Sequence, residues 1–190
     1  MKVIAISGKA EAGKTYTAKA LENILNSKGY STKILPLAYE LKKIAIAVGW
    51  NCKKDEKGRK FLQALGGVIK DYNGKECFAR ATINKALKHD PDFLIIDDLR
   101  LRDEYNFLYI RFDTVFIRVE RPGHDNMLTE EQRKDVSEVD LDAFRFDLTL
   151  YNDGTDRFDK QIEKKVVDDY LDRHGFLRSN EDRAEKNNSR

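Results

Sequence analysis

AISGKAEAGKTYT, residues 5–17, joins an apolar run to a helical pattern through a glycine loop. Residues 8–15 satisfy the pattern G-x-x-x-x-G-K-[ST]. Before the loop, residues 2–7 (KVIAIS) form a β-branched apolar run that suits a buried parallel strand, and after it Leu21, Ile24 and Leu25 recur at helical spacing. A strand, a glycine loop and a helix in this order indicate a phosphate-binding loop rather than a polar turn.

Each fixed position of this loop has a physical reason. Glycine at 8 and 13 permits backbone conformations that a side chain would block, so successive N–H groups can converge on phosphate oxygens at a helix N-terminus. We expect Lys14 to reach the β- and γ-phosphates and the Thr15 hydroxyl to bind Mg²⁺. The sequence therefore predicts an ATP site formed by Gly8, Ala10, Glu11, Ala12, Gly13, Lys14, Thr15 and Tyr16.

Four further apolar runs predict an α/β chain with the three-layer P-loop NTPase fold, in which helices cover both faces of a five-stranded parallel sheet. These runs cover residues 33–37, 92–98, 114–120 and 147–152. Pro36 favours a sheet edge or a strand end for the first of them. We expect a helical insert near residues 40–90, which includes a charged loop at residues 49–59, to bind the acceptor of the phosphoryl group. The polar stretch near residues 121–143 is long for an α/β connection, and we expect it to act as a lid.

Length and composition predict one domain, with the P-loop, over residues 1–177 and a disordered polar tail at 178–190. A chain of 190 residues can bury a core without disulfides, and its net charge of only +2 argues against a dedicated nucleic-acid surface. The two cysteines and three histidines have no metal-ligand spacing. Without a secretory signal or a long apolar run, we expect a cytoplasmic protein with reduced thiols and no membrane contact.

Asp97 and Asp98 end the most apolar run of the chain, DFLIIDD at 92–98. A P-loop protein carries the acid that holds Mg²⁺ through water at such a position, and open α/β sheets bind ligands at the carboxyl ends of their strands. One of the two acids could instead cap the helix that starts near Arg102. If the acceptor were an alcohol, either acid could also act as the general base.

Transfer of a phosphoryl group to a phosphorylated acceptor concentrates negative charge, so we expect cations besides Lys14. Arginine suits this role because its planar fork binds phosphate oxygens in pairs. Arg100 follows the acids at the carboxyl end of the same strand. The insert contributes Arg59 and Arg80 as candidates for the acceptor side, and the polar stretch contributes lid cations as a group: Arg118, Arg121, Arg133 and Lys134.

Six blocks of the chain occur in the order found in deoxynucleoside monophosphate kinases of the bacteriophage type, which the sequence resembles up to about Val167. They are GKAEAGKT (8–15), GRKFLQALGGVIKD (58–71), IIDDLRLRDE (95–104), IRVERPG (117–123), SEVDLDAFRFD (137–147) and NDGT (152–155). Beyond the P-loop no block is specific alone, but their order and spacing are.

The resemblance implies transfer of the ATP γ-phosphate to a deoxynucleoside monophosphate with Mg²⁺, a homodimer, and the host cytoplasm if the chain is of phage origin. The family block D-h-R-x-x-x-E matches Asp98, Arg100 and Glu104, which favours Asp98 over Asp97 as the functional acid. The resemblance further assigns Gln63 and Gly66 to the acceptor, and Asn152 and Gly154 to the adenine of ATP. With Lys14, the catalytic set becomes Lys14, Asp98, Arg100, Arg121 and Arg133.

Two departures from the family pattern bear on the acceptor. Residues 101–103 are Leu-Arg-Asp where the family often has Phe-Pro-Asn, and Gly67 stands where Thr is common. Animal phosphomevalonate kinases show a similar SE-x-x-LD block, so another phosphorylated metabolite stays an alternative acceptor. A nucleotide-dependent switch protein and a nucleic-acid-binding ATPase that uses the basic tail are further alternatives.

Overall fold

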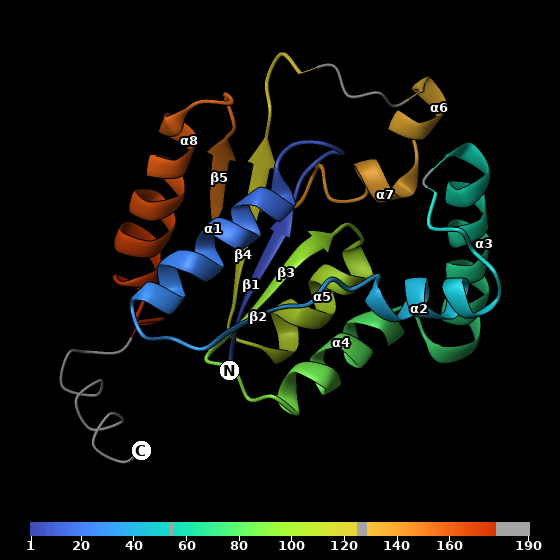
Figure 1. Ribbon diagram of the computed structural model, residues 1–190, viewed down its shortest axis with the longest axis horizontal. Coiled ribbons are helices and arrows are strands. Elements are labelled where there is room, and N and C mark those ends of the chain that lie inside the picture. The colour runs from blue at the N-terminus through green and yellow to red at the C-terminus, as the bar shows by residue number, and fades with distance from the viewer. Residues whose placement is uncertain (54, 125–128, 178–190) are drawn as a thin grey trace.

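The computed structural model describes residues 1–53, 55–124 and 129–177, and it contains a five-stranded parallel sheet with helices on both faces (Figure 1). The spatial order of the strands is β2-β3-β1-β4-β5. This confirms the predicted three-layer α/β fold. The strands are β1 (Lys2–Ser7), β2 (Thr32–Ile34), β3 (Phe93–Leu99), β4 (Thr114–Glu120) and β5 (Leu148–Tyr151).

Two hydrophobic clusters hold the helices against the sheet. One cluster joins its first face to α1 (Lys14–Ser27), α8 (Asp156–Gln161) and the π-helical η1 (Ile162–Leu171). The other joins the second face to α4 (Cys77–Leu87) and α5 (Arg102–Arg111). Both clusters draw on β1, because its successive side chains point to opposite faces and are wholly buried. Its central position explains why β1 reads as a continuous apolar run rather than an alternating one.

The insert between β2 and β3 contains α2 (Tyr39–Ala47) and α3 (Glu56–Asn73) in addition to α4. The sequence suggested a charged loop over residues 49–59, but α3 begins within it. Asp55 starts the helix there, because its Oδ1 accepts the Gly58 N–H at 2.8 Å and so caps the first turn. β2 is shorter than predicted. It lies at a sheet edge and ends before Pro36, as the proline suggested.

The polar stretch between β4 and β5 contains two short helices, α6 (Glu130–Arg133) and α7 (Val136–Val139). Residues 125–128 of the predicted lid and the predicted tail at 178–190 lie outside the described residues. The segment that follows α7 brings Leu141 into the second hydrophobic cluster and packs Phe144 and Phe146 against it. This part of the stretch is therefore fixed against the sheet.

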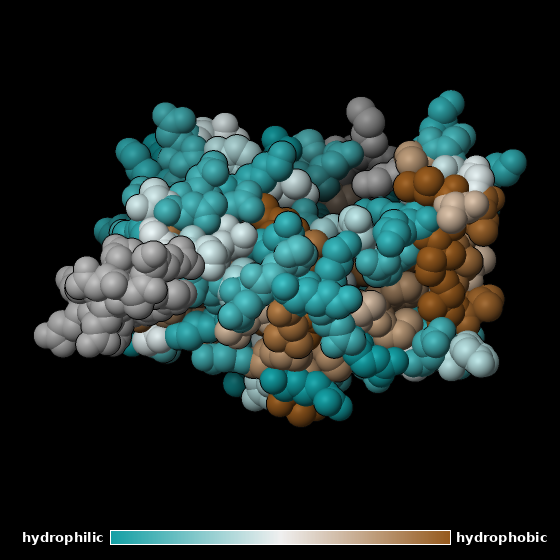
Figure 2. Space-filling model, turned by 60° about the horizontal axis from the view of Figure 1, so that its bottom comes forward, coloured by the Kyte–Doolittle hydropathy of each residue, from teal (hydrophilic) through white to brown (hydrophobic). Residues whose placement is uncertain are grey.

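Exposed apolar side chains gather over the insert. Ile46 on α2, Val48 directly after α2 and Val68 on α3 are each at least half exposed, and Figure 2 shows a hydrophobic area on the side of the molecule where these helices lie. Among the described helices, none combines the length and the apolar character that crossing a membrane would take.

Candidate functional site

The glycine loop has a backbone that only glycine can support at two positions. Gly8 has φ 153°, and a Cβ there would lie 2.3 Å from the Val119 carbonyl oxygen. Gly13 has φ 108°, and a Cβ there would lie 2.5 Å from Nδ2 of Asn152. That Asn152 amide donates to the Ala12 carbonyl at 2.9 Å, so the start of the β5–α8 loop braces the glycine loop against α1.

Lys14 lies at the centre of the loop and is only 8% exposed. Its ammonium donates to the carbonyls of Gly8 and Lys9, each at 2.7 Å. The pKa of Lys14 is lowered to about 8, mainly by burial and then by the positive charge of Arg100, while the carboxylates of Glu138, Asp98 and Asp97 oppose the shift. Lys14 is therefore electrostatically coupled to the groups at the end of β3.

The structure separates the two acids of β3. Asp97 Oδ2 accepts the Thr15 hydroxyl at 2.7 Å, beside the glycine loop. Asp98 instead accepts the N–H groups of Leu37 and Ala38 at 2.6 and 3.1 Å, just before α2. Burial raises the pKa of Asp98, which fits a group enclosed by protein. The resemblance favoured Asp98 as the functional acid, but in the structure Asp97 is the acid that meets Thr15, because neighbouring strand residues point to opposite faces.

The helix that starts near Arg102 is capped by a different residue from the two acids considered for that role. Asp98 caps the chain entering α2, whereas the N-terminus of α5 is capped by Glu104. Oε2 of Glu104 accepts the N–H groups of Arg100 and Leu101 at 3.3 and 3.1 Å. Its Oε1 lies 3.6 Å from the Lys70 ammonium. Because Glu104 is buried and used in this way, it fixes the turn that carries Arg100 instead of facing an acceptor.

Arg100 contacts a carboxylate that the sequence analysis did not single out as a site residue. Its guanidinium forms an ion pair with Oε1 of Glu138 and lies 3.4 Å from the Ser137 carbonyl. The other oxygen of Glu138, Oε2, accepts the Ala10 N–H of the glycine loop at 3.0 Å. Glu138 is the second residue of the SE-x-x-LD block, so its position in that block was the one available signal.

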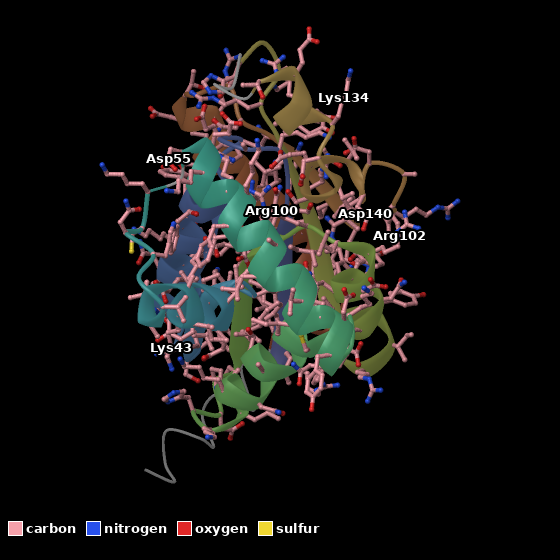
Figure 3. All side chains as sticks on the ribbon, turned by 90° about the vertical axis from the view of Figure 1, so that its right-hand side faces the viewer. Lys43, Asp55, Arg100, Arg102, Lys134 and Asp140 are labelled. Atoms are coloured by element: carbon pink, nitrogen blue, oxygen red, sulfur yellow. The ribbon has the colours of Figure 1, made fainter. Side chains whose placement is uncertain are left out.

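Residues 135–142, which we call the acidic strap, carry four acids that bind four different elements. Asp135 accepts the Gln63 amide of α3 at 2.6 Å. Asp140 accepts the Arg102 N–H and Nε at 2.8 and 2.7 Å. Asp142 accepts Lys9 of the loop at 2.6 Å and Arg118 of β4 at 2.7 Å. Figure 3, which looks onto α3, shows Arg100 near the middle of this face and the Arg102–Asp140 pair.

Several predicted donor-site residues gather around Glu11, although not all face the loop. Arg121 Nη1 lies 3.5 Å from the Glu11 carbonyl, and Nη2 lies 4.0 Å from where a Cβ on Gly154 would be. His124 Nε2 contacts the Glu11 carboxylate at 3.2 Å. The Tyr16 hydroxyl points elsewhere, donating to Asp159 of α8 at 2.6 Å. Arg121 therefore lies on the side of Gly154 and not beside Arg100.

Of the residues predicted to bind the acceptor, some lie near the acidic strap and others lie far from it. Gln63 reaches the acidic strap, and Gly66 gives room for Leu41, whose Cδ2 would lie 3.3 Å from an added Cβ. Arg80 binds Glu76 at 3.1 Å and the Asn73 carbonyl at 2.9 Å, at the far end of α3. Ten helical residues separate Asn73 from Gln63, which is about 15 Å along the axis. The structure thus does not bring Arg80 to the strap.

The two remaining predicted arginines lie at helix ends. Arg59 is in the first turn of α3, and Arg133 ends α6.

A pocket of about 400 Å³ adjoins the glycine loop through Lys9 and the strap through Asp142. It is also lined by Arg118, Glu120, Phe144, Phe146 and Thr149. The sequence analysis did not select the two phenylalanines, because nothing in the pattern separates them from core residues.

Glu104 gives a pH dependence of stability that can be measured. Burial raises its pKa to about 7, against the opposing charge of Lys70. Because the folded pKa is raised, the folded state holds the proton more tightly, and the contribution of Glu104 to stability is lost as pH rises from about 4.5 to about 7. We expect the free energy of unfolding of wild type, relative to Glu104→Gln, to fall by at most about 3 kcal/mol across that range.

Urea unfolding of both proteins at pH 5 and pH 8 measures this change. Glutamine keeps a carbonyl oxygen for the N–H groups at the start of α5 but does not titrate, so the other ionisable groups cancel in the comparison. A difference between the two proteins that is the same at both pH values would contradict the assignment.

Comparisons with known proteins agree with this fold. No protein-family model matches the chain, and no curated protein matches it in sequence. Among solved structures, a candidate kinase from Chloroflexus aurantiacus aligns with 14% identity and a TM-score of 0.52, covering 91% of this chain and 94% of that one. Shikimate kinase from Aquifex aeolicus aligns with 15% identity and a TM-score of 0.48, covering 89% and 98% of the two chains.

An APS kinase from Mycobacterium tuberculosis also aligns, with 15% identity and a TM-score of 0.45, covering 88% and 94% of the two chains. At such identities the likeness concerns the fold alone. The chain has the three-layer fold of the P-loop kinases, and its chemistry must be argued from its own residues.

Proposed function

We propose that this protein is an ATP-dependent kinase that transfers the γ-phosphate to a deoxynucleoside monophosphate. The observation that carries the proposal is the convergence of the glycine loop, Lys14, the Thr15–Asp97 pair and Arg100 at the carboxyl end of the sheet. Phosphoryl transfer depends mainly on positioning and on cations around the transferred group, and this set supplies both.

The Thr15–Asp97 pair fits Mg²⁺. Its hydroxyl and carboxylate oxygens lie 2.7 Å apart beside the loop, and Mg²⁺ in kinases takes one or two such protein oxygens together with phosphate oxygens and water. When bound, the metal would neutralise charge that develops on the phosphates. In this proposal Thr15 supplies a ligand directly, and Asp97 acts directly or through water.

Lys14 and Arg100 then neutralise the negative charge of two different parts of the substrates. Lys14 sits inside the loop and binds the β- and γ-phosphates in place of the Gly8 and Lys9 carbonyls. Arg100 lies beyond Ala10, where the transferred group meets its acceptor, and it stabilises the phosphoryl oxygens. The second pKa of a phosphate monoester is about 6, so the attacking oxygen of such an acceptor is already ionised at neutral pH and needs no general base.

The choice of acceptor rests on the resemblance and on one contact. The family's acceptor block includes Gln63, and this residue reaches the acidic strap beside Arg100 through Asp135. We therefore propose that α3 and the rest of the insert near residues 40–90 form one wall of the acceptor site. The stretch near 121–143 forms the lid that excludes water, with Arg121 on the donor side. Arg59 and Arg133 remain proposed cations of this enclosure.

An acceptor panel tests the proposal. Purified protein with ATP and Mg²⁺ is offered the four deoxynucleoside monophosphates, the matching ribonucleotides, phosphomevalonate and an unphosphorylated deoxynucleoside, and ADP release is measured. We expect turnover that at least one deoxynucleoside monophosphate accelerates strongly. Acceleration by phosphomevalonate alone would indicate a kinase for a different phosphorylated metabolite. Slow ATP turnover that no acceptor changes would favour a nucleotide-dependent switch protein.

A further inference from the structure

Glu138 places a buried carboxylate on the glycine loop. The residue is 8% exposed, and its two oxygens take different donors. Oε2 accepts the Ala10 N–H at 3.0 Å, and Oε1 binds the Arg100 guanidinium. Removing a carboxylate from water is costly unless strong donors replace the water, and here a loop amide and an arginine do so.

These two donors are also the ones that a phosphoryl oxygen would use. The N–H groups of a glycine loop bind phosphate, and an arginine at the carboxyl end of a neighbouring strand completes the anion site. Glu138 therefore occupies an anion-binding position with an anion of the protein's own. It comes from neither of the two elements that form the position, since it lies on α7 of the acidic strap.

The rest of the strap is attached independently of Glu138. Asp135 binds Gln63, Asp140 binds Arg102, and Asp142 binds Lys9 and Arg118. The Glu138 side chain can therefore leave Ala10 and Arg100 while its neighbours keep the strap in place. Departure of this one side chain would expose the anion position without unfolding the segment.

We propose that Glu138 is a specificity-determining residue whose carboxylate must be exchanged for an oxyanion of the ligand. A phosphate group can replace it, because it satisfies both donors and brings at least an equal charge. A neutral hydroxyl cannot, since it would leave Arg100 without its ion pair. The selection of a phosphorylated acceptor rests on the proposed function, whereas the competition between Glu138 and phosphate at the loop does not.

The competition is tested by binding alone, with inorganic pyrophosphate and ATP as probes in isothermal titration calorimetry. Glu138→Gln keeps the size of the side chain but removes the internal anion. We expect it to bind pyrophosphate about tenfold more tightly than wild type, because a like charge at the binding position is gone. Asp140→Asn is the matched control: it removes the same charge from the same strap, but Asp140 binds Arg102 of α5 and not the glycine loop or Arg100.

Equal or weaker pyrophosphate binding by Glu138→Gln overturns the inference, and so does an equal gain in Asp140→Asn, which would indicate a general charge effect. Circular dichroism and thermal unfolding of each variant accompany the titration. If Glu138→Gln does not fold, wild-type protein still decides the matter by hydrogen–deuterium exchange. Pyrophosphate should then increase hydrogen exchange at residues 136–142 while it protects the glycine loop. Unchanged hydrogen exchange at residues 136–142 would contradict the replacement of the Glu138 carboxylate by phosphate.

The selection of a phosphorylated acceptor is tested with the same variants. If Glu138 selects for phosphate, the ratio of kcat/KM for a deoxynucleoside monophosphate over the unphosphorylated deoxynucleoside should fall by about tenfold in Glu138→Gln. An unchanged ratio would remove the selection role. A protein with no kinase activity at all would defeat the proposed function, yet the pyrophosphate result would stand on its own.

Discussion

Replacing Lys14 by methionine is expected to lower kcat about a hundredfold to a thousandfold, because one preorganised cation disappears from a site that excludes water. Methionine has nearly the length of lysine without its charge, so it can occupy the same buried position. Loss of the ammonium leaves the loop amides, and we expect weakened but measurable ATP binding. Steady-state ADP release with a saturating deoxynucleoside monophosphate gives kcat, and calorimetry with ATP gives the dissociation constant.

The control for this variant is Lys19→Met on the same helix. Lys19 is exposed on α1, so it tests the loss of one positive charge outside the loop. We expect kcat within about twofold of wild type, since exposed charges are largely screened. A Lys14→Met protein that is as active as Lys19→Met would remove Lys14 from the reaction, and with it the interpretation of the glycine loop as the donor site.

The second large effect separates the two acids of β3. Asp97→Asn should reduce kcat about a hundredfold and raise the Mg²⁺ concentration needed for half-maximal rate, because the Thr15–Asp97 pair loses its charge. The fold should be unaffected, since the amide can still accept the Thr15 hydroxyl at this partly exposed position. Mg²⁺ titrations of the rate and thermal unfolding measure the two parts of the expectation.

Asp98→Asn should behave in the opposite way. Its carboxylate accepts two backbone N–H groups in a partly buried position, and asparagine offers one oxygen and one amide to them. One N–H before α2 would lose its acceptor, and the free energy of unfolding should drop by about 1–3 kcal/mol. If Asp98→Asn kept its stability and lost its Mg²⁺ dependence, the assignment of Asp97 to the metal would be reversed.

The predicted architecture held where the sequence pattern is local and strong. β1, β4 and the start of α5 agree with the runs and spacings from which they were predicted, because burial on both faces demands continuous apolar strands. The start of α3 was misplaced, since residues 49–59 are charged and the Asp55 cap was not weighed against that charge. For the glycine loop, the pattern itself specified the residues, because no side chain fits at Gly8 or Gly13.

The candidate site was only partly predictable, and the reason is long-range contact. Whether Asp97 or Asp98 meets Thr15 depends on which face of β3 turns toward α1, and adjacent acids look equivalent in a sequence. Arg80 was selected for its charge, but its position on α4 ties it to Glu76 instead. Glu138 was missed because its place in the SE-x-x-LD block assigns it no role, and its contacts with Ala10 and Arg100 form only when the strap folds back onto the loop.

The sequence by itself determined the parallel α/β fold and the phosphate-binding loop, because hydrophobic periodicity and glycine sterics act between residues close in the chain. Only the tertiary structure decided which acid faces Thr15, that Glu104 holds the Arg100 turn, and that Glu138 lies between Ala10 and Arg100. The Thr15–Asp97 and Ala10–Glu138 contacts join residues 82 and 128 positions apart in the chain. Their partners are chosen by how the strands and the strap pack, which no local pattern encodes.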